Sequence, residues 1–162
     1  FLDKYQHWST YTPEEQSVVI AAGSVYGNTT NAAEILAGML AERGVKNIAF
    51  YDVSNTHPSV LVSEAFRCSH LVFASSTYNN GIFTPMETVL LDLAAHNLQN
   101  RTVALIENGS WAPVSGKLMR EVLGKMKNIQ ILDSSLTLRS SMKEDQLASL
   151  ESLADAIVKS LE

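Results

Sequence analysis

The chain has 162 residues, of which 46% are hydrophobic and 18% are charged, and its formal net charge is −5. This composition fits one globular domain with a sizeable core, excludes a disordered chain, and argues against an extended nucleic-acid surface. No apolar run in these residues is long enough to span a membrane, no signal-peptide pattern is visible in them, and Cys68 is their only cysteine. We therefore expect a cytoplasmic protein without an internal disulfide.

The first 16 residues differ in character from the rest of the chain. They include Tyr5, Trp8 and Pro13 and have no clear period, so we interpret residues 1–16 as a leader or linker and residues 17–162 as one domain. Because the sequence begins with Phe1 and not with Met, we expect it to be a piece of a longer protein.

Apolar runs and segments with helical spacing alternate along residues 17–162. We predict strands over residues 18–23, 46–53, 71–75, 103–106 and 129–132. We predict helices over residues 28–43, 58–67, 86–93, 118–126 and 147–161. This alternation predicts an α/β fold, in which helices cover both faces of a doubly wound five-stranded parallel sheet. Right-handed crossovers leave few topologies, and the favoured strand order is 2-1-3-4-5.

Three loops are expected to meet at one edge of such a sheet. Ligands bind beyond the carboxyl ends of the strands, at the switch point beside the first strand. The loops that follow the first, third and fourth strands all reach this point, so their residues are the candidates for a binding site.

The first of these loops has the properties of a phosphate-binding turn. A helix start has unpaired backbone N–H groups and a partial positive charge, and Gly27 lets the backbone approach an anion closely. The loop lacks the Lys of a triphosphatase loop, the Gly-x-Gly-x-x-Gly of a dinucleotide fingerprint and the acidic residues of a receiver domain. An uncharged phosphate site remains, formed by Ser24, Val25, Tyr26, Gly27, Asn28 and Thr29. The alternative is an ordinary turn with Asn28 or Thr29 as the helix N-cap.

The other two loops each carry one aromatic residue among Asn, Ser, Thr and Gly residues. Aromatic faces can stack on a planar ring, and amide groups can bind the polar edge of that ring. The candidate ring-binding residues are Thr77, Tyr78, Asn79, Asn80 and Gly81 in one loop, and Asn108, Gly109, Ser110 and Trp111 in the other. The alternative is that Tyr78 and Trp111 only cap the core.

These three loops together resemble the flavodoxin-like FMN-binding domains of the short-chain type. More specifically, the turn Tyr-Gly-Asn-Thr at 26–29 and the run Thr-Tyr-Asn-Asn-Gly-Ile-Phe at 77–83 are similar to those of the C-terminal flavodoxin domain of flavodiiron proteins, also called A-type flavoproteins. The resemblance covers residues 18 to the end, and the leader resembles the connection between the two domains of that family. The run Asn-Gly-Ser-Trp at 108–111 departs from the family's pattern by one aromatic residue.

The resemblance implies an electron-transport flavoprotein. FMN would place its phosphate on residues 24–29 and its isoalloxazine between residues 77–81 and 108–111, and no residue is assigned a catalytic role. The implied partner is a di-iron domain, rubredoxin or a flavin/NAD(P)H reductase, because the family acts as an oxygen or nitric oxide reductase. The di-iron domain is absent from this sequence, whose four His form no ligand cluster: His7, His57, His70 and His96. The alternatives are an NAD(P)H-dependent FMN quinone reductase and a flavin-free interaction domain.

Glu107 is the acidic residue closest in sequence to the expected ring loops. A carboxylate near a reduced, negatively charged flavin would disfavour reduction by Coulomb repulsion. We therefore expect that Glu107 lowers the reduction potential, and the alternative is a solvated carboxylate with a negligible effect.

Overall fold

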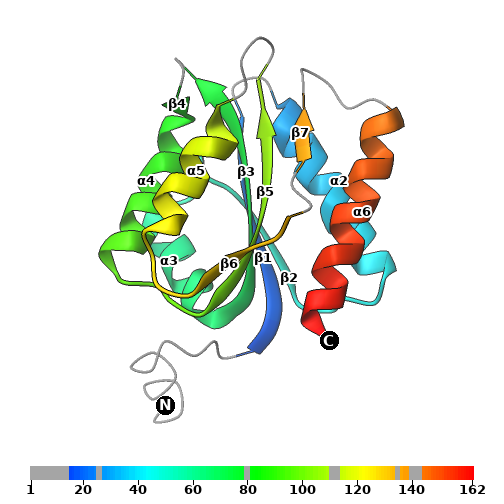
Figure 1. Cartoon of the computed structure of the whole chain (residues 1–162), viewed down its shortest axis with the longest axis horizontal. Coiled ribbons are helices and arrows are strands. Elements are labelled where there is room, and N and C mark those ends of the chain that lie inside the picture. Colours follow the sequence, from blue (N-terminus) through cyan, green and yellow to red (C-terminus); the bar gives the residue numbers. More distant parts are fainter. Residues whose placement is uncertain (1–14, 25–26, 79–80, 110–113, 134–135, 139–143) are drawn as a thin grey trace.

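The computed structural model describes residues 15–24, 27–78, 81–109, 114–133, 136–138 and 144–162 (Figure 1). The leader expected at residues 1–16 lies outside this part of the chain except for its last two residues. The strands are β1 (Glu15–Gly23), β2 (Ile48–Asp52), β3 (Cys68–Tyr78), β4 (Gly81–Ile82), β5 (Arg101–Asn108), β6 (Ile129–Ile131) and β7 (Leu136–Leu138). The helices are α2 (Asn28–Glu42), α3 (Pro58–Arg67), α4 (Thr84–Ala95), α5 (Ser115–Gly124) and α6 (Glu144–Leu161).

The parallel strands follow the order β2-β1-β3-β5-β6, which confirms the predicted topology. Two short strands were not predicted. β4 pairs with the end of β3 in an antiparallel hairpin, and β7 pairs with β5 in parallel. β6 pairs with the first residues of β5, and β7 pairs with its last residues. The two short strands therefore lie one after the other along the same side of β5.

The sheet lies between two helical layers (Figure 1). Helices α3, α4 and α5 cover one face, and α2 and α6 cover the other. In β1, Val19 and Ala21 pack into the first core, whereas Val18 and Ile20 pack into the second. Successive side chains of a strand point to opposite faces, so a strand that is buried on both faces must be apolar throughout. This explains why the central strands are continuous apolar runs in the sequence.

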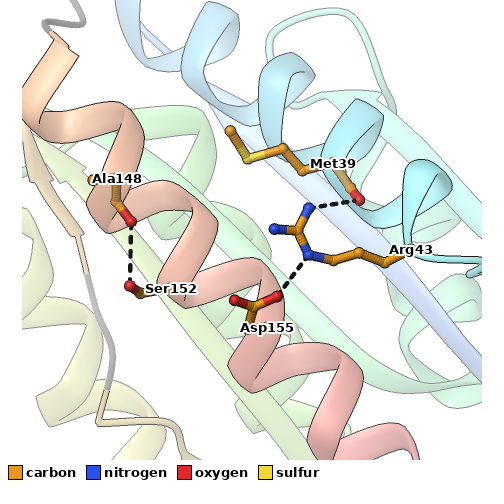
Figure 2. A network of polar contacts seen from close by, with 5 residues as sticks. All are labelled: Met39, Arg43, Ala148, Ser152 and Asp155. Atoms are coloured by element: carbon orange, nitrogen blue, oxygen red, sulfur yellow. Dashed lines mark hydrogen bonds and ion pairs between the residues drawn. The ribbon is translucent and has the colours of Figure 1, made fainter.

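Helices α2 and α6 also contact each other through an ion pair on the outer surface (Figure 2). The Arg43 Nε–H group donates to Asp155 Oδ1 at 2.7 Å, and an Nη1–H group of the same guanidinium donates to the Met39 carbonyl at 3.2 Å. Because Asp155 is largely exposed, we expect this pair to contribute little to stability. No helix in the described part of the chain combines the length and the apolar character that a membrane span requires.

A buried histidine connects the sheet to α6. His70 in β3 is 5% exposed, and its ring nitrogens lie 2.7 Å from Ser69 Oγ and 2.8 Å from Ser160 Oγ. The two hydroxyl groups also contact the carbonyls of Ser17 and Ile157, and a neutral ring donates to one hydroxyl and accepts from the other. Burial disfavours the charged imidazolium and lowers the pKa of His70 below its ordinary value.

This burial predicts a loss of stability in acid. The unfolded chain binds a proton at His70 below the ordinary histidine pKa of about 6.5, whereas the folded chain resists protonation. The contribution of neutral His70 to folding stability is therefore complete above the unfolded-state pKa, and it is lost as the pH falls toward the lower pKa of the folded state. We expect urea unfolding midpoints of wild type to fall more between pH 7.5 and 5.5 than those of His70→Gln. His96→Gln, at an exposed site, serves as the control and should keep the wild-type slope. Equal slopes in wild type and His70→Gln would contradict this account.

Candidate functional site

The carboxyl ends of four strands lie side by side at one edge of the sheet. Gly23 of β1 is in register with Ser75 of β3, which is in register with Glu107 of β5, which is in register with Thr137 of β7. Ser76 and Asn108 form the next row. The ends of the three strands that precede the expected binding loops are therefore neighbours. Of the candidate residues, six lie outside the described part of the chain: Val25, Tyr26, Asn79, Asn80, Ser110 and Trp111.

Helix α2 begins at this edge with an open N-terminus. Its N-cap is Gly27, and not Asn28 or Thr29, and no side chain of the described residues caps it. Gly27 has the left-handed φ of 86°, and a Cβ built there would have no neighbour within 4 Å. The first turn contains no acidic residue. The unpaired N–H groups and the helix dipole make this position suited to an anion.

Two pairs of hydroxyl groups flank the start of α2. Ser24 Oγ lies 3.0 Å from Thr30 Oγ1, and the fully buried Thr29 Oγ1 lies 3.0 Å from Ser76 Oγ in β3. One hydroxyl of each pair donates to the other, so one hydroxyl hydrogen in each pair remains for a further acceptor. The second pair also connects the turn after β1 to the end of β3.

Helix α5 begins at the same edge, but its N-terminus is bound by side chains from the sheet. Thr77 Oγ1 accepts from the backbone N–H groups of Val114 at 3.0 Å and of Ser115 at 3.2 Å. Glu107 Oε2 accepts from the N–H group of Gly116 at 2.7 Å. The hydroxyl of Thr77, expected among the ring-binding groups, therefore has a structural partner in α5.

Helices α3 and α4 also begin at this edge, and their first residues have an internal partner or an acidic residue. His57 Nδ1 accepts from the Ser59 N–H group at the start of α3, and α4 carries Glu87 in its first turn. Among the described residues, α2 is the one helix of α2 to α5 that has neither a capping side chain nor an acidic residue at its start. An anion bound at this edge would therefore be expected at α2.

The hairpin of β3 and β4 forms the second side of the candidate site. Tyr78 pairs with Gly81, and its side chain is 48% exposed, whereas Ile82 is buried. Phe83, directly after β4, packs over Gly23, where a Cβ would lie only 2.8 Å from Phe83 Cδ2. The hairpin therefore lies directly against the end of β1, and its exposed aromatic ring is available for stacking.

The end of β5 forms the third side. Asn108 is 7% exposed, and the Gly109 N–H group donates to the Leu138 carbonyl of β7 at 3.1 Å. Both residues therefore have positions fixed by the sheet, next to Ser76 at the end of β3.

Two other features do not qualify as functional sites. In the described part of the chain, no three His, Cys, Asp or Glu side chains gather where they could bind a metal. A hollow of about 320 Å³ lies at the opposite edge of the sheet, where Gln16 lies near the start of β1 and Asn47 precedes β2. It is shallow, and its Arg43 already pairs with Asp155.

Comparison with solved structures identifies the fold. The rubredoxin:oxygen oxidoreductase of Desulfovibrio gigas superposes with a TM-score of 0.90 at 22% identity, over 99% of this chain and 39% of that protein. The flavodiiron protein of Giardia intestinalis superposes with a TM-score of 0.85 at 16% identity, over 99% of this chain and 40% of that protein. A flavodoxin from the domain Archaea superposes with a TM-score of 0.75 at 20% identity, over 91% of this chain and 99% of that protein. The fold is flavodoxin-like. No protein-family model and no curated protein matches the sequence.

The flavodoxin-like chain spans about 40% of the length of the flavodiiron chains that it matches and almost the whole length of the flavodoxin. With identities of 22% or lower, this likeness establishes the fold. What the flavodoxin-like sheet binds must be argued from the residues at its edge.

Two features were not predicted from the sequence. They are the hydrogen bonds of Glu107 to neighbouring elements and the hairpin strand β4. The dipeptide Asn80-Gly81 is a signal for a tight hairpin turn and could have identified β4. The residues that enter α5, Pro113 and Val114, include no capping side chain. This absence was a sign that Thr77 or another residue distant in sequence must supply the cap.

Proposed function

We propose that this chain is an FMN-binding electron-transfer domain that delivers electrons to a di-iron domain. The observation that carries the proposal is the open N-terminus of α2. It lies at the switch point between β1 and β3, next to the hairpin that presents Tyr78. A phosphate group and an aromatic ring system would find complementary surfaces on adjacent loops there.

The residues at α2 fit a phosphate monoester. Gly27 leaves space above the helix start, and the hydroxyl pairs that include Ser24 and Thr29 offer neutral donors. Four hydrogen bonds to phosphate would contribute roughly 6–12 kcal/mol, and ordering a ligand costs about 4–15 kcal/mol. Because these two ranges overlap, the phosphate contacts leave little net affinity, and we expect burial of the ring to supply the surplus.

The ring would lie between the hairpin and the end of β5. Tyr78 would stack on it, and Gly81, Asn108 and Gly109 would bind its edge, together with the residues proposed from the sequence: Asn79, Asn80, Ser110 and Trp111. Bound FMN supplies the capacity to accept and release electrons. The protein residues hold and orient the ring, and exclude water from one of its faces.

The partners belong to the same proposal. The Desulfovibrio gigas protein is described as a rubredoxin:oxygen oxidoreductase, and the Giardia intestinalis protein as a flavodiiron protein. A di-iron domain as electron acceptor, with rubredoxin or a flavin/NAD(P)H reductase as donor, follows for this chain by analogy with those proteins. A cytoplasmic location is part of this analogy.

Titration of the apo-protein with FMN tests the proposal. We expect flavin fluorescence to be quenched on binding, and FMN to bind at least tenfold more tightly than riboflavin, a difference of about 1.4 kcal/mol, because riboflavin lacks the phosphate. The absence of quenching by either ligand would contradict the proposal and favour an interaction domain without flavin. Rapid bleaching of the FMN-loaded protein by NADH alone would instead favour a quinone reductase.

A further inference from the structure

The side chain of Glu107 uses both of its carboxylate oxygens. Oε2 accepts from the backbone N–H group of Gly116 at 2.7 Å, and Oε1 accepts from the hydroxyl of Thr137 at 2.8 Å. Glu107 therefore connects three elements, because it belongs to β5, Gly116 lies in the first turn of α5, and Thr137 lies in β7.

The contact with α5 is tight. A Cβ built on Gly116 would lie 2.7 Å from both Cδ and Oε2 of Glu107, so this position has space for glycine only while the carboxylate stays in place. Thr77 binds the N–H groups immediately before Gly116, and the hydroxyl of Ser115 donates to the Ser75 carbonyl at 3.0 Å. The start of α5 is therefore fixed on β3 and β5 at the edge that carries the candidate site.

The contact with β7 fixes the other side of the same strand end. The last residues of β5 pair with β7, and the Gly109 N–H group donates to the Leu138 carbonyl at 3.1 Å. Thr137, which binds Glu107, stands next to Leu138. The carboxylate therefore helps to hold β7 alongside Asn108 and Gly109.

We propose that Glu107 is a positioning residue of the flavin site. Its carboxylate fixes Asn108, Gly109 and the start of α5 relative to one another, and thereby the ring-binding side of the site, without contacting the ligand. This inference rests on the proposed function. It differs from the sequence-based expectation, in which the charge of Glu107 acts on the flavin potential, because here the hydrogen-bonding geometry is the essential property.

Variants at three positions separate geometry from charge. Glu107→Gln keeps an acceptor for Gly116 and gains a donor for Thr137, so its Kd for FMN should stay within about threefold of wild type, whereas Glu107→Ala should raise Kd about tenfold, the change that about 1.4 kcal/mol produces. FMN and riboflavin should be affected equally, because the phosphate turn is untouched. Potentiometry on Glu107→Gln tests the charge effect separately.

Gly116→Ala and Thr137→Val provide tests that leave Glu107 in the sequence. The new methyl group at position 116 would displace the carboxylate, while alanine is a better helix former than glycine, so a weaker affinity is expected without a matching loss of stability. Thr137→Val removes one contact and should give an intermediate Kd.

These results can overturn the inference independently of the proposed function. If wild type binds no flavin, the proposed function fails. If wild type binds flavin and Glu107→Ala and Gly116→Ala bind it equally well, the positioning role fails alone. If Glu107→Gln loses as much affinity as Glu107→Ala, charge and not geometry is the essential property, and the inference is wrong.

Discussion

Replacing Asn28 with aspartate is expected to weaken FMN binding about a hundredfold and to leave riboflavin binding unchanged. Asn28 is the first residue of α2, next to the N-cap Gly27, so the variant places a carboxylate where we propose that the phosphate binds. At an effective dielectric of about 40, a dianion about 6 Å from a carboxylate is destabilised by about 3 kcal/mol. The measurement is the ratio of the riboflavin and FMN dissociation constants, obtained by fluorescence quenching.

The same variant should stabilise the apo-protein, which makes the prediction specific. The first turn of α2 contains no acidic residue, and a negative charge at a helix N-terminus is worth about 0.3–1 kcal/mol. Asn47→Asp is a matched control, because it makes the same chemical change at the opposite edge of the sheet, where the Asn47 carbonyl accepts from Val18. Equal losses of FMN and riboflavin affinity in Asn28→Asp would show that the phosphate does not lie at α2.

The sequence was sufficient to predict the sheet and its order. The buried strands are apolar on both faces, so runs such as Val18–Ile20 stand out, and their alternation with helical segments allows few topologies. The helix predicted over residues 58–67 coincides with α3, because Pro58 opens it. Strand β3 extends three residues beyond each end of the predicted strand. Its start was missed because Ser69 and His70 are polar, and their burial depends on hydrogen bonds that the sequence does not reveal.

The site was less predictable because its residues act through partners distant in sequence. Thr77 remains a predicted ring-binding residue, and what its position in the sequence does not reveal is that its hydroxyl caps α5, 37 residues further along the chain. The sequence predicts an effect of Glu107 through its charge, and the structure adds that its oxygens bind Gly116 and Thr137. Strand β7 has three residues and no turn signal that would reveal it. Such contacts depend on which loops the fold brings together, and a local pattern does not specify them.

The second large effect is expected at Arg101, on the opposite edge of the sheet from the candidate site. This side chain is 2% exposed, and burial lowers its pKa to about 10, so it is still charged at neutral pH. Its guanidinium donates to the carbonyls of Ala65 and Phe66 at the end of α3, and of Gln99 and Asn100 before β5. It also lies over the Phe66 ring, 5.9 Å from its centre. A single side chain therefore satisfies the last carbonyls of a helix and fixes the loop that enters β5.

Replacing Arg101 with Met, of similar length, should lower the free energy of unfolding by about 3 kcal/mol, because buried carbonyls lose a charged donor. Arg101→Lys should give an intermediate loss, since an ammonium cannot reproduce the planar set of donors. Arg43→Met is the matched control: its ion pair with Asp155 lies on the surface, and its removal should change the urea midpoint far less. The FMN affinity of folded Arg101→Met should equal that of wild type, because α2 begins at the other edge. If the urea midpoints of Arg101→Met and Arg43→Met fall equally, the buried guanidinium is not the organising contact that we infer.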